Sequence, residues 1–258
     1  MYFRTIVTLI TTLLLAAYAF PVPQATTYED TLKLLRSLKN RKDDREILAT
    51  LFQKGDARIG DLIKVLHEPD RNISLNAQIV IRYLGNRSGM RALEEWYAAQ
   101  AEIVRSGPNP LPLSERDYRW FSEQPLRNTE SSDVYALALD GSPKAQAVLN
   151  KMIESYDEST DAGTSAGEAL KRVKVGHPEA LSGDGDLAEL VLKNAFFIDT
   201  GSRRYTSARL LGLNGTKDKA LVEVYVNRRA LAEEWYHVVI SKCGKSWKFF
   251  SITQIAVS

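Results

Sequence analysis

Histidine and cysteine often carry acid–base, nucleophilic or metal chemistry, and this chain of 258 residues has three histidines and one cysteine. The histidines lie far apart, and none has a nucleophile and an orienting group at a spacing that defines a catalytic site. Glycine motifs that hold phosphates or dinucleotides, and the two-histidine motif of zinc proteases, are absent from the sequence. We therefore predict no catalysis, no bound metal and no cofactor.

His237 is the histidine that we expect to line a pocket. It occurs in a stretch of alternating residues, which is typical of a strand. With its neighbour Tyr236 it forms a candidate ligand-binding site, placed between the strands and a helix predicted over 187–196. The alternative is a buried or surface imidazole whose hydrogen bonds are satisfied. His67 lies at a predicted helix end and His177 precedes a proline, so neither is a candidate.

Two arginine pairs, Arg203-Arg204 and Arg228-Arg229, lie in predicted loops and form a candidate anion-binding site if those loops meet. The alternative is solvated surface charge. Asp184-Gly185-Asp186 lacks the regularly spaced oxygen ligands of a calcium loop, so we predict that Asp186 caps a helix. The single Cys243 excludes an internal disulfide and a cysteine-based metal site. We expect it to be buried in a strand, and the alternative is a reactive or intermolecular thiol.

The elements that must position these residues are of two kinds, and the first is a helical hairpin between Gly55 and Leu93. Apolar residues recur at helical spacing before and after Pro69: Ile59, Leu62, Ile63 and Leu66, then Ile73, Ala77, Val80, Ile81 and Leu84. Pro69 and the polar residues around it predict a turn, and Gly85-Asn86 predicts a left-handed helix end. Two short amphipathic helices cannot bury both apolar faces alone, so similar hairpins are expected to stack on them.

This hairpin resembles the HEAT repeat family. The resemblance rests on the run Glu68-Pro69-Asp70-Arg71-Asn72-Ile73 and on Ala77, Val80, Ile81, Leu84 and Gly85, which follow it. It covers roughly residues 28–175 and implies an α-solenoid with a concave surface for a protein partner. Ser74 departs from the family, which often carries an arginine there. Some HEAT-repeat proteins are lyases that attach cofactors, so the resemblance also implies an enzyme as an alternative.

An insertion predicted over 106–132 interrupts the repeats. It opens with Gly107-Pro108-Asn109-Pro110-Leu111-Pro112, which cannot continue a helix, and an aromatic cluster follows. Insertions in solenoids often lie on the binding face, so Tyr118, Trp120 and Phe121 are candidate partner-binding residues. The alternative is that they fold back over the apolar edge of the repeats.

The second kind of element follows a linker predicted over 176–186. Residues 187–258 begin with a helical pattern and continue with alternating stretches, separated by the turn motifs Asn214-Gly215 and Cys243-Gly244-Lys245. They predict a small α+β domain, in which a helix lies on a four-stranded antiparallel meander. This order resembles the C-terminal half of the nuclear-transport-factor-like or cystatin-like fold.

Residues 1–25 are predicted to be a signal peptide. Arg4 precedes an apolar core, and Ala17-Tyr18-Ala19 fits cleavage after Ala19. We therefore expect an exported protein, periplasmic or secreted, that contacts a membrane only if this segment is retained. Hydrophobic residues are 44% and charged residues 26%, with a net charge of +2, so composition is that of a globular protein and predicts no nucleic-acid partner.

The whole chain is thus expected to be multidomain, with a HEAT-like helical domain over 28–175 and an α+β domain over 187–258. The function that we predict is an exported protein-binding scaffold or adaptor, whose partner is another protein. One alternative is a small-ligand-binding module with a pocket near His237. Another is a lyase-like enzyme.

Overall fold

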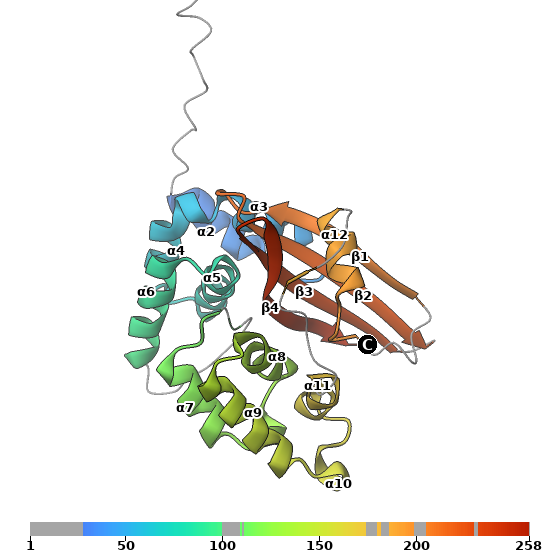
Figure 1. The fold of residues 1–258 in the computed structure, drawn as a ribbon. Coiled ribbons are helices and arrows are strands. Elements are labelled where there is room, and N and C mark those ends of the chain that lie inside the picture. Colours follow the sequence, from blue (N-terminus) through green and yellow to red (C-terminus); the bar gives the residue numbers. More distant parts are fainter. Residues whose placement is uncertain are drawn as a thin grey trace, which may run out of the picture.

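The computed structural model describes residues 28–99, 109, 111–173, 180–181, 186–198, 205–229 and 232–257. The predicted signal peptide lies outside these ranges. Within them, helices come first and a four-stranded antiparallel sheet follows (Figure 1). In the same ranges, no helix has the length and apolar character needed to span a membrane.

The helices are α2 (Tyr28–Ser37), α3 (Arg45–Lys54), α4 (Ile59–Val65), α5 (Arg71–Leu84), α6 (Arg87–Ala98), α7 (Glu115–Glu123), α8 (Ser131–Asp140), α9 (Pro143–Ser155), α10 (Glu158–Asp161), α11 (Ser165–Val173) and α12 (Leu187–Lys193), with short 3-10 turns at Asp56–Arg58 and Leu126–Asn128. The strands are β1 (Tyr205–Leu213), β2 (Lys219–Arg229), β3 (Ala232–Cys243) and β4 (Ser246–Val257).

The hairpin predicted around Pro69 is present as α4 and α5, which pack on each other. The Asp70 carboxylate accepts hydrogen bonds from the backbone N–H groups of Asn72 and Ile73, and an N-cap of this kind stabilises a helix by about 1 kcal/mol. Gly85 ends α5 in the left-handed region, with φ of 55°. The predicted turn at Pro69 and the predicted left-handed helix end at Gly85 are present, and α5 begins at Arg71.

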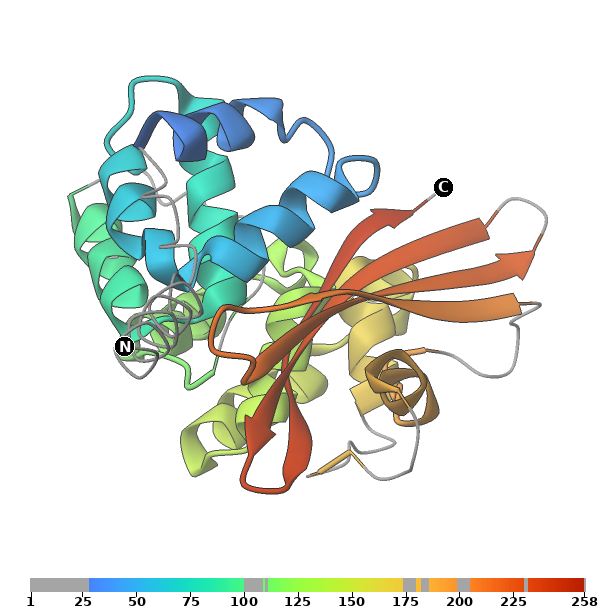
Figure 2. The same ribbon diagram turned by 90° about the horizontal axis from the view of Figure 1, so that it is seen from above.

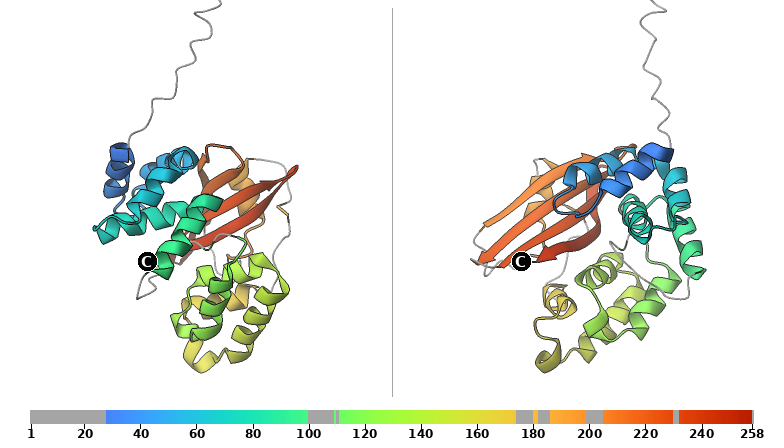
Figure 3. Two further views of the ribbon diagram at one scale, coloured as in Figure 1. Left: turned by 90° about the vertical axis from the view of Figure 1, so that its left-hand side faces the viewer. Right: turned by 180° about the vertical axis from the view of Figure 1, so that it is seen from behind.

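The helices follow an arc whose inner side faces the sheet (Figures 1 and 2). On the inner side, α3 contacts β1 and α8 contacts β4, while Tyr83 of α5 and Arg172 of α11 hydrogen-bond residues of β3. Helices α4, α6, α7 and α9 lie further out, as the two other views also show (Figure 3). The inner surface of the arc is therefore covered by the chain's own sheet.

The sheet is a meander with the strand order β1-β2-β3-β4, and both hairpin turns predicted from the sequence are present. Both of its faces are buried, because successive side chains of a strand point to opposite sides. Leu221 and Val239 pack in one core with α2 to α6. Val222 and Val238 pack in a second core with α8, α11 and α12. Each core thus contains residues of the helical region and of the sheet.

Candidate functional site

The aromatic cluster of the predicted insertion lies on α7 and points largely inward. Tyr118 is 7% exposed and Phe121 is 2% exposed, and half-buried Trp120 packs against the same core. The Tyr118 hydroxyl donates a hydrogen bond of 3.0 Å to Asp140 Oδ1 at the end of α8. The aromatic residues are therefore folded back over the apolar side of the helices, which was the alternative to partner binding.

His237 and Tyr236, the candidate ligand pair, lie on opposite faces of the sheet. Both side chains are fully buried, His237 toward α5 and Tyr236 toward α8 and α11. They are consecutive in β3, and consecutive strand residues cannot share one pocket. The predicted pocket between His237 and helix 187–196 is thus corrected, because α12 packs in the core on the Tyr236 side.

Tyr236 belongs to a hydrogen-bonded network that joins three elements. Its hydroxyl accepts a hydrogen bond from Arg172 Nη1 at 3.0 Å and donates one to Glu234 Oε2 at 2.7 Å. Arg172 Nη1 also donates to the Tyr135 hydroxyl at 3.2 Å, so α11, α8 and β3 are tied together. Charge-assisted hydrogen bonds of this kind compensate the cost of burying Arg172 and Glu234. The network holds α8 and α11 against β3 and leaves Tyr236 inaccessible to a ligand.

His237 belongs to a polar row that crosses the sheet. Glu223 of β2, His237 of β3 and Thr253 of β4 are direct cross-strand neighbours, and all three are less than a tenth exposed. The Tyr83 hydroxyl lies 2.9 Å from His237 Nδ1, and Arg45 Nη1 lies 3.1 Å from Glu223 Oε1. The row therefore connects α5 and the start of α3 to the sheet.

Burial decides the charge of this row. It lowers the pKa of His237 to about 3, with Arg41 and Arg45 adding to the effect, so the imidazole is neutral near pH 7. Burial also raises the pKa of Glu223, against the opposing pull of Arg45. Burial raises the pKa of the Tyr83 hydroxyl, against the opposing effect of nearby Arg41. This hydroxyl and His237 Nδ1 share one hydrogen bond, whose direction depends on which ring nitrogen carries the proton.

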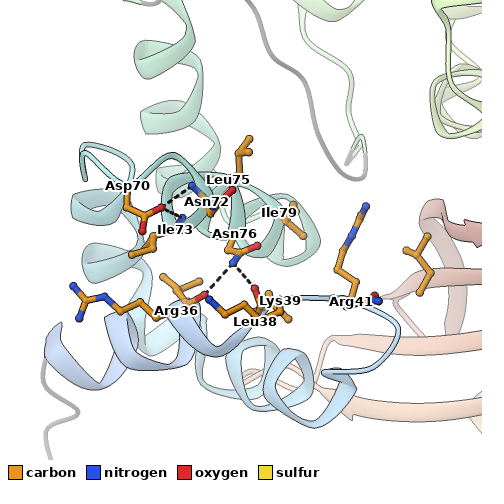
Figure 4. A pocket seen from close by; sticks show the side chains of 13 residues that line it. Arg36, Leu38, Lys39, Arg41, Asp70, Asn72, Ile73, Leu75, Asn76 and Ile79 are labelled. Carbon is orange, nitrogen blue, oxygen red and sulfur yellow. Dashed lines mark hydrogen bonds between the residues drawn. The ribbon is translucent and has the colours of Figure 1, made fainter.

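An open groove lies beside this buried row, between α2, α5 and the end of β4 (Figure 4). Its volume is about 540 Å³, which is within the usual range for ligand sites. Half-buried Leu75, buried Ile79 and half-buried Ile255 give it an apolar wall, and Arg41 reaches into it from the loop after α2. The groove has no local signal in the sequence, because its walls come from segments far apart in the chain.

The floor of the groove is held by Asn76, whose amide nitrogen joins α5 to the end of α2. Asn76 Nδ2 donates hydrogen bonds of 2.9 Å to the Leu35 carbonyl and 2.7 Å to the Leu38 carbonyl. The Leu35 carbonyl belongs to the last turn of α2 and the Leu38 carbonyl follows directly after this helix, where backbone carbonyls lack the regular helical partner. The groove is therefore formed by fixed elements.

The side chains of the candidate anion-binding site lie outside what the structure describes. Arg203 and Arg204 lie outside the described residues, and Arg228 and Arg229 end β2, where the structure describes the backbone but not their side chains. Asp186 caps α12 as predicted, accepting a hydrogen bond of 2.9 Å from the Glu189 backbone N–H.

The prediction that Cys243 is buried is wrong. It is the last residue of β3, and it lies exposed beside the turn at Gly244.

The described ranges contain no group of three or more histidine, cysteine, aspartate or glutamate residues that would hold a metal ion. Comparison with known proteins gives no family model that matches the chain and no significant match among curated proteins.

Proposed function

We propose that this chain is an exported, non-catalytic scaffold that binds another protein. The observation that carries the proposal is the open groove between α2, α5 and β4, which lies where helices and sheet meet. Its apolar wall and charged rim have the composition of a protein-binding surface, in which an apolar centre is surrounded by polar groups. The buried imidazole of His237 is inaccessible, which favours binding over chemistry at this position.

We also propose that the helical region is built from HEAT-like hairpins. The pair α4 and α5, with its turn before Asp70 and its glycine end at Gly85, supports this. So does the arrangement of α3, α5, α8 and α11 on the inside of the arc. Solenoids usually bind partners on the inner surface. Here the sheet covers that surface, so the partner is assigned to the groove beside it.

Capture of partners by purified protein tests this function. Wild-type protein and a Leu75→Glu variant, immobilised separately, are exposed to the exported fraction of the native host. Leu75 is half-buried in the groove wall, so a carboxylate there disfavours an apolar contact. Leu210→Glu is the matched control, because Leu210 is a 39% exposed leucine on β1, outside the groove.

We expect proteins that wild type and Leu210→Glu retain and Leu75→Glu does not. Retention of no protein above the level of bare resin by wild type would exclude the scaffold. Equal retention by all three would leave a scaffold whose binding surface lies elsewhere.

A further inference from the structure

We infer that the groove binds an extended acidic segment of a partner protein. In this arrangement, carboxylates of the segment face Arg36, Lys39 and Arg41, and its apolar side chains pack on Leu75, Ile79 and Ile255. The inference rests on the proposed function, because it names the kind of partner that the same groove takes.

The charge of the groove is the first argument. Its lining has three cationic side chains, Arg36, Lys39 and Arg41, and one carboxylate, Asp70. Asp70 is already the N-cap of α5 and accepts hydrogen bonds from two backbone N–H groups. The lining therefore attracts negative charge, and Arg36 and Lys39 are exposed and available to it.

The acidic residues next to the groove are also occupied. Asp44 Oδ2 accepts hydrogen bonds from the backbone N–H groups of Lys39 at 2.6 Å and Asn40 at 2.8 Å, which lower the pKa of this carboxyl. Asp43 Oδ2 accepts a hydrogen bond of 2.8 Å from Asn40 Nδ2. These carboxylates fold the loop that carries Arg41, and neither forms an ion pair of 4.0 Å or less with a cation of the groove among the described residues.

Arg41 provides the second argument. Its side chain enters the groove (Figure 4), and its Nη1 has no hydrogen-bond partner among the described residues. A guanidinium presents several donors in a plane and matches a carboxylate better than any other side chain does. A small turn of Arg41 toward a carboxylate in the groove would pair the nitrogen that is otherwise unsatisfied.

The arrangement of the lining favours an extended chain. Cations lie on the α2 side of the groove, whereas Leu75 and Ile79 lie on α5 and Ile255 on β4. An extended peptide points successive side chains to opposite sides. Alternating acidic and apolar residues would therefore meet the cations with one side and the apolar wall with the other.

A peptide titration tests the inference without a natural partner. The probe is a fluorescent peptide of about eight residues with glutamate and leucine in alternation, which spans roughly 27 Å when extended. A second peptide has glutamine in place of glutamate, and a third has serine in place of leucine. The receptors are wild type, the double variant Arg36→Glu, Lys39→Glu, and the control double variant Lys33→Glu, Arg71→Glu. All four positions are exposed, and the control pair does not line the groove.

We expect the glutamate–leucine peptide to bind wild type, and the groove variant to bind it about tenfold more weakly at moderate salt. The control variant carries the same change in net charge and is expected to lose less than about threefold, because neither of its positions lines the groove and exposed charges without direct contact interact weakly. The inference is overturned if the glutamine or serine peptide binds equally well, or if both double variants weaken binding to the same extent.

The two proposals fail in different ways. Capture of a protein that depends on Leu75, with no binding of the acidic peptide, would keep the scaffold and exclude this class of partner. If the peptide binds but no protein is captured, the groove binds acidic extended segments as inferred, and the scaffold function is excluded.

Discussion

His237 and Glu223 face each other inside the protein without a direct hydrogen bond. The distance between His237 Nε2 and Glu223 Oε2 is 4.0 Å, which exceeds hydrogen-bond length. The groups around His237 come from five segments: Tyr83 from α5, Arg41 from the loop after α2, Arg45 from α3, Glu223 from β2 and Thr253 from β4. The arginines and burial both oppose a charge on the imidazole, so this side chain is a source of acid sensitivity.

We predict that a variant His237→Gln loses less stability in acid than wild type does. The ordinary histidine pKa is 6.5, and the folded protein lowers it to about 3. Between these values the unfolded chain binds a proton that the folded chain does not, so the free energy of unfolding falls as pH falls, by about 1.4 kcal/mol per pH unit. Urea unfolding at about pH 7 and about pH 4.5 measures this, and the wild-type loss is expected to exceed that of the variant by about 2 kcal/mol.

His67→Gln is the control for this measurement, because His67 is exposed at the end of α4. It should follow the wild-type pH dependence. Glu223 contributes with the opposite sign, since its raised pKa favours folding as pH falls, but it is present in all three proteins. Equal acid losses in wild type and His237→Gln would show that His237 titrates normally.

At the scale of the elements, the end of α5 is fitted closely to the sheet. A Cβ added to Gly85 would lie 2.3 Å from the ring of Phe250 on β4, and the residue has φ of +55°. Both the left-handed backbone and the contact with Phe250 require glycine. The same residue therefore ends the helix and sets how near β4 lies to it.

We predict that Gly85→Ala lowers the free energy of unfolding by about 2 kcal/mol or more, from the left-handed backbone and the clash with Phe250. Gly60→Ala is the matched control, because Gly60 lies within α4 and an added Cβ would meet no atom within 4 Å. It is expected to stabilise the protein by about 0.5–1 kcal/mol, through the better helix propensity of alanine. Chemical denaturation measures the free energy of unfolding of both variants, which we expect to fall in Gly85→Ala and to rise in Gly60→Ala. Equal changes in the two variants would contradict this account.

The individual elements could be predicted from the sequence because their signals are local. Pro69 and Gly85 delimit α5, and the alternating residues around His237 define β3. What packs on each face could not be predicted, because an apolar face does not specify its partner. The inward position of Phe121 depends on such contacts, as does the position of Tyr83 beside His237.

The groove and the polar row are both formed by segments that lie far apart in the sequence. Glu223 lies between valines that share the other face of β2, so the sequence places it on the side of His237. Nothing local shows that Tyr83, 154 positions earlier, completes the row. Likewise, the cations from Arg36 to Arg41 appear in the sequence as a charged break between helices, and the fold places Ile255 beside them.

At the scale of the whole molecule, both hydrophobic cores contain residues of the helices and of the sheet. We predict a single unfolding transition. The four tryptophans allow the test: Trp96 and Trp120 lie on helices, and Trp235 and Trp247 lie on strands. Replacing either pair by phenylalanine leaves a protein whose fluorescence reports on one region.

In each of these two variants, the denaturation midpoint from fluorescence is expected to coincide with the midpoint from far-ultraviolet circular dichroism. Independent folding of the two regions would separate the midpoints, most clearly when only the strand tryptophans remain.

The sheet that covers the inner side of the arc follows the helices in the chain, so it is synthesised after them. Until β4 has emerged, the apolar surfaces of α5 and α8 that face the sheet have no cover, and a nascent chain exposes them to water and to other chains. We therefore expect the newly made protein to depend on chaperones until β4 is complete. Protease digestion of ribosome-arrested chains that stop before and after β4 would reveal this, through protection that begins only with the longer chain.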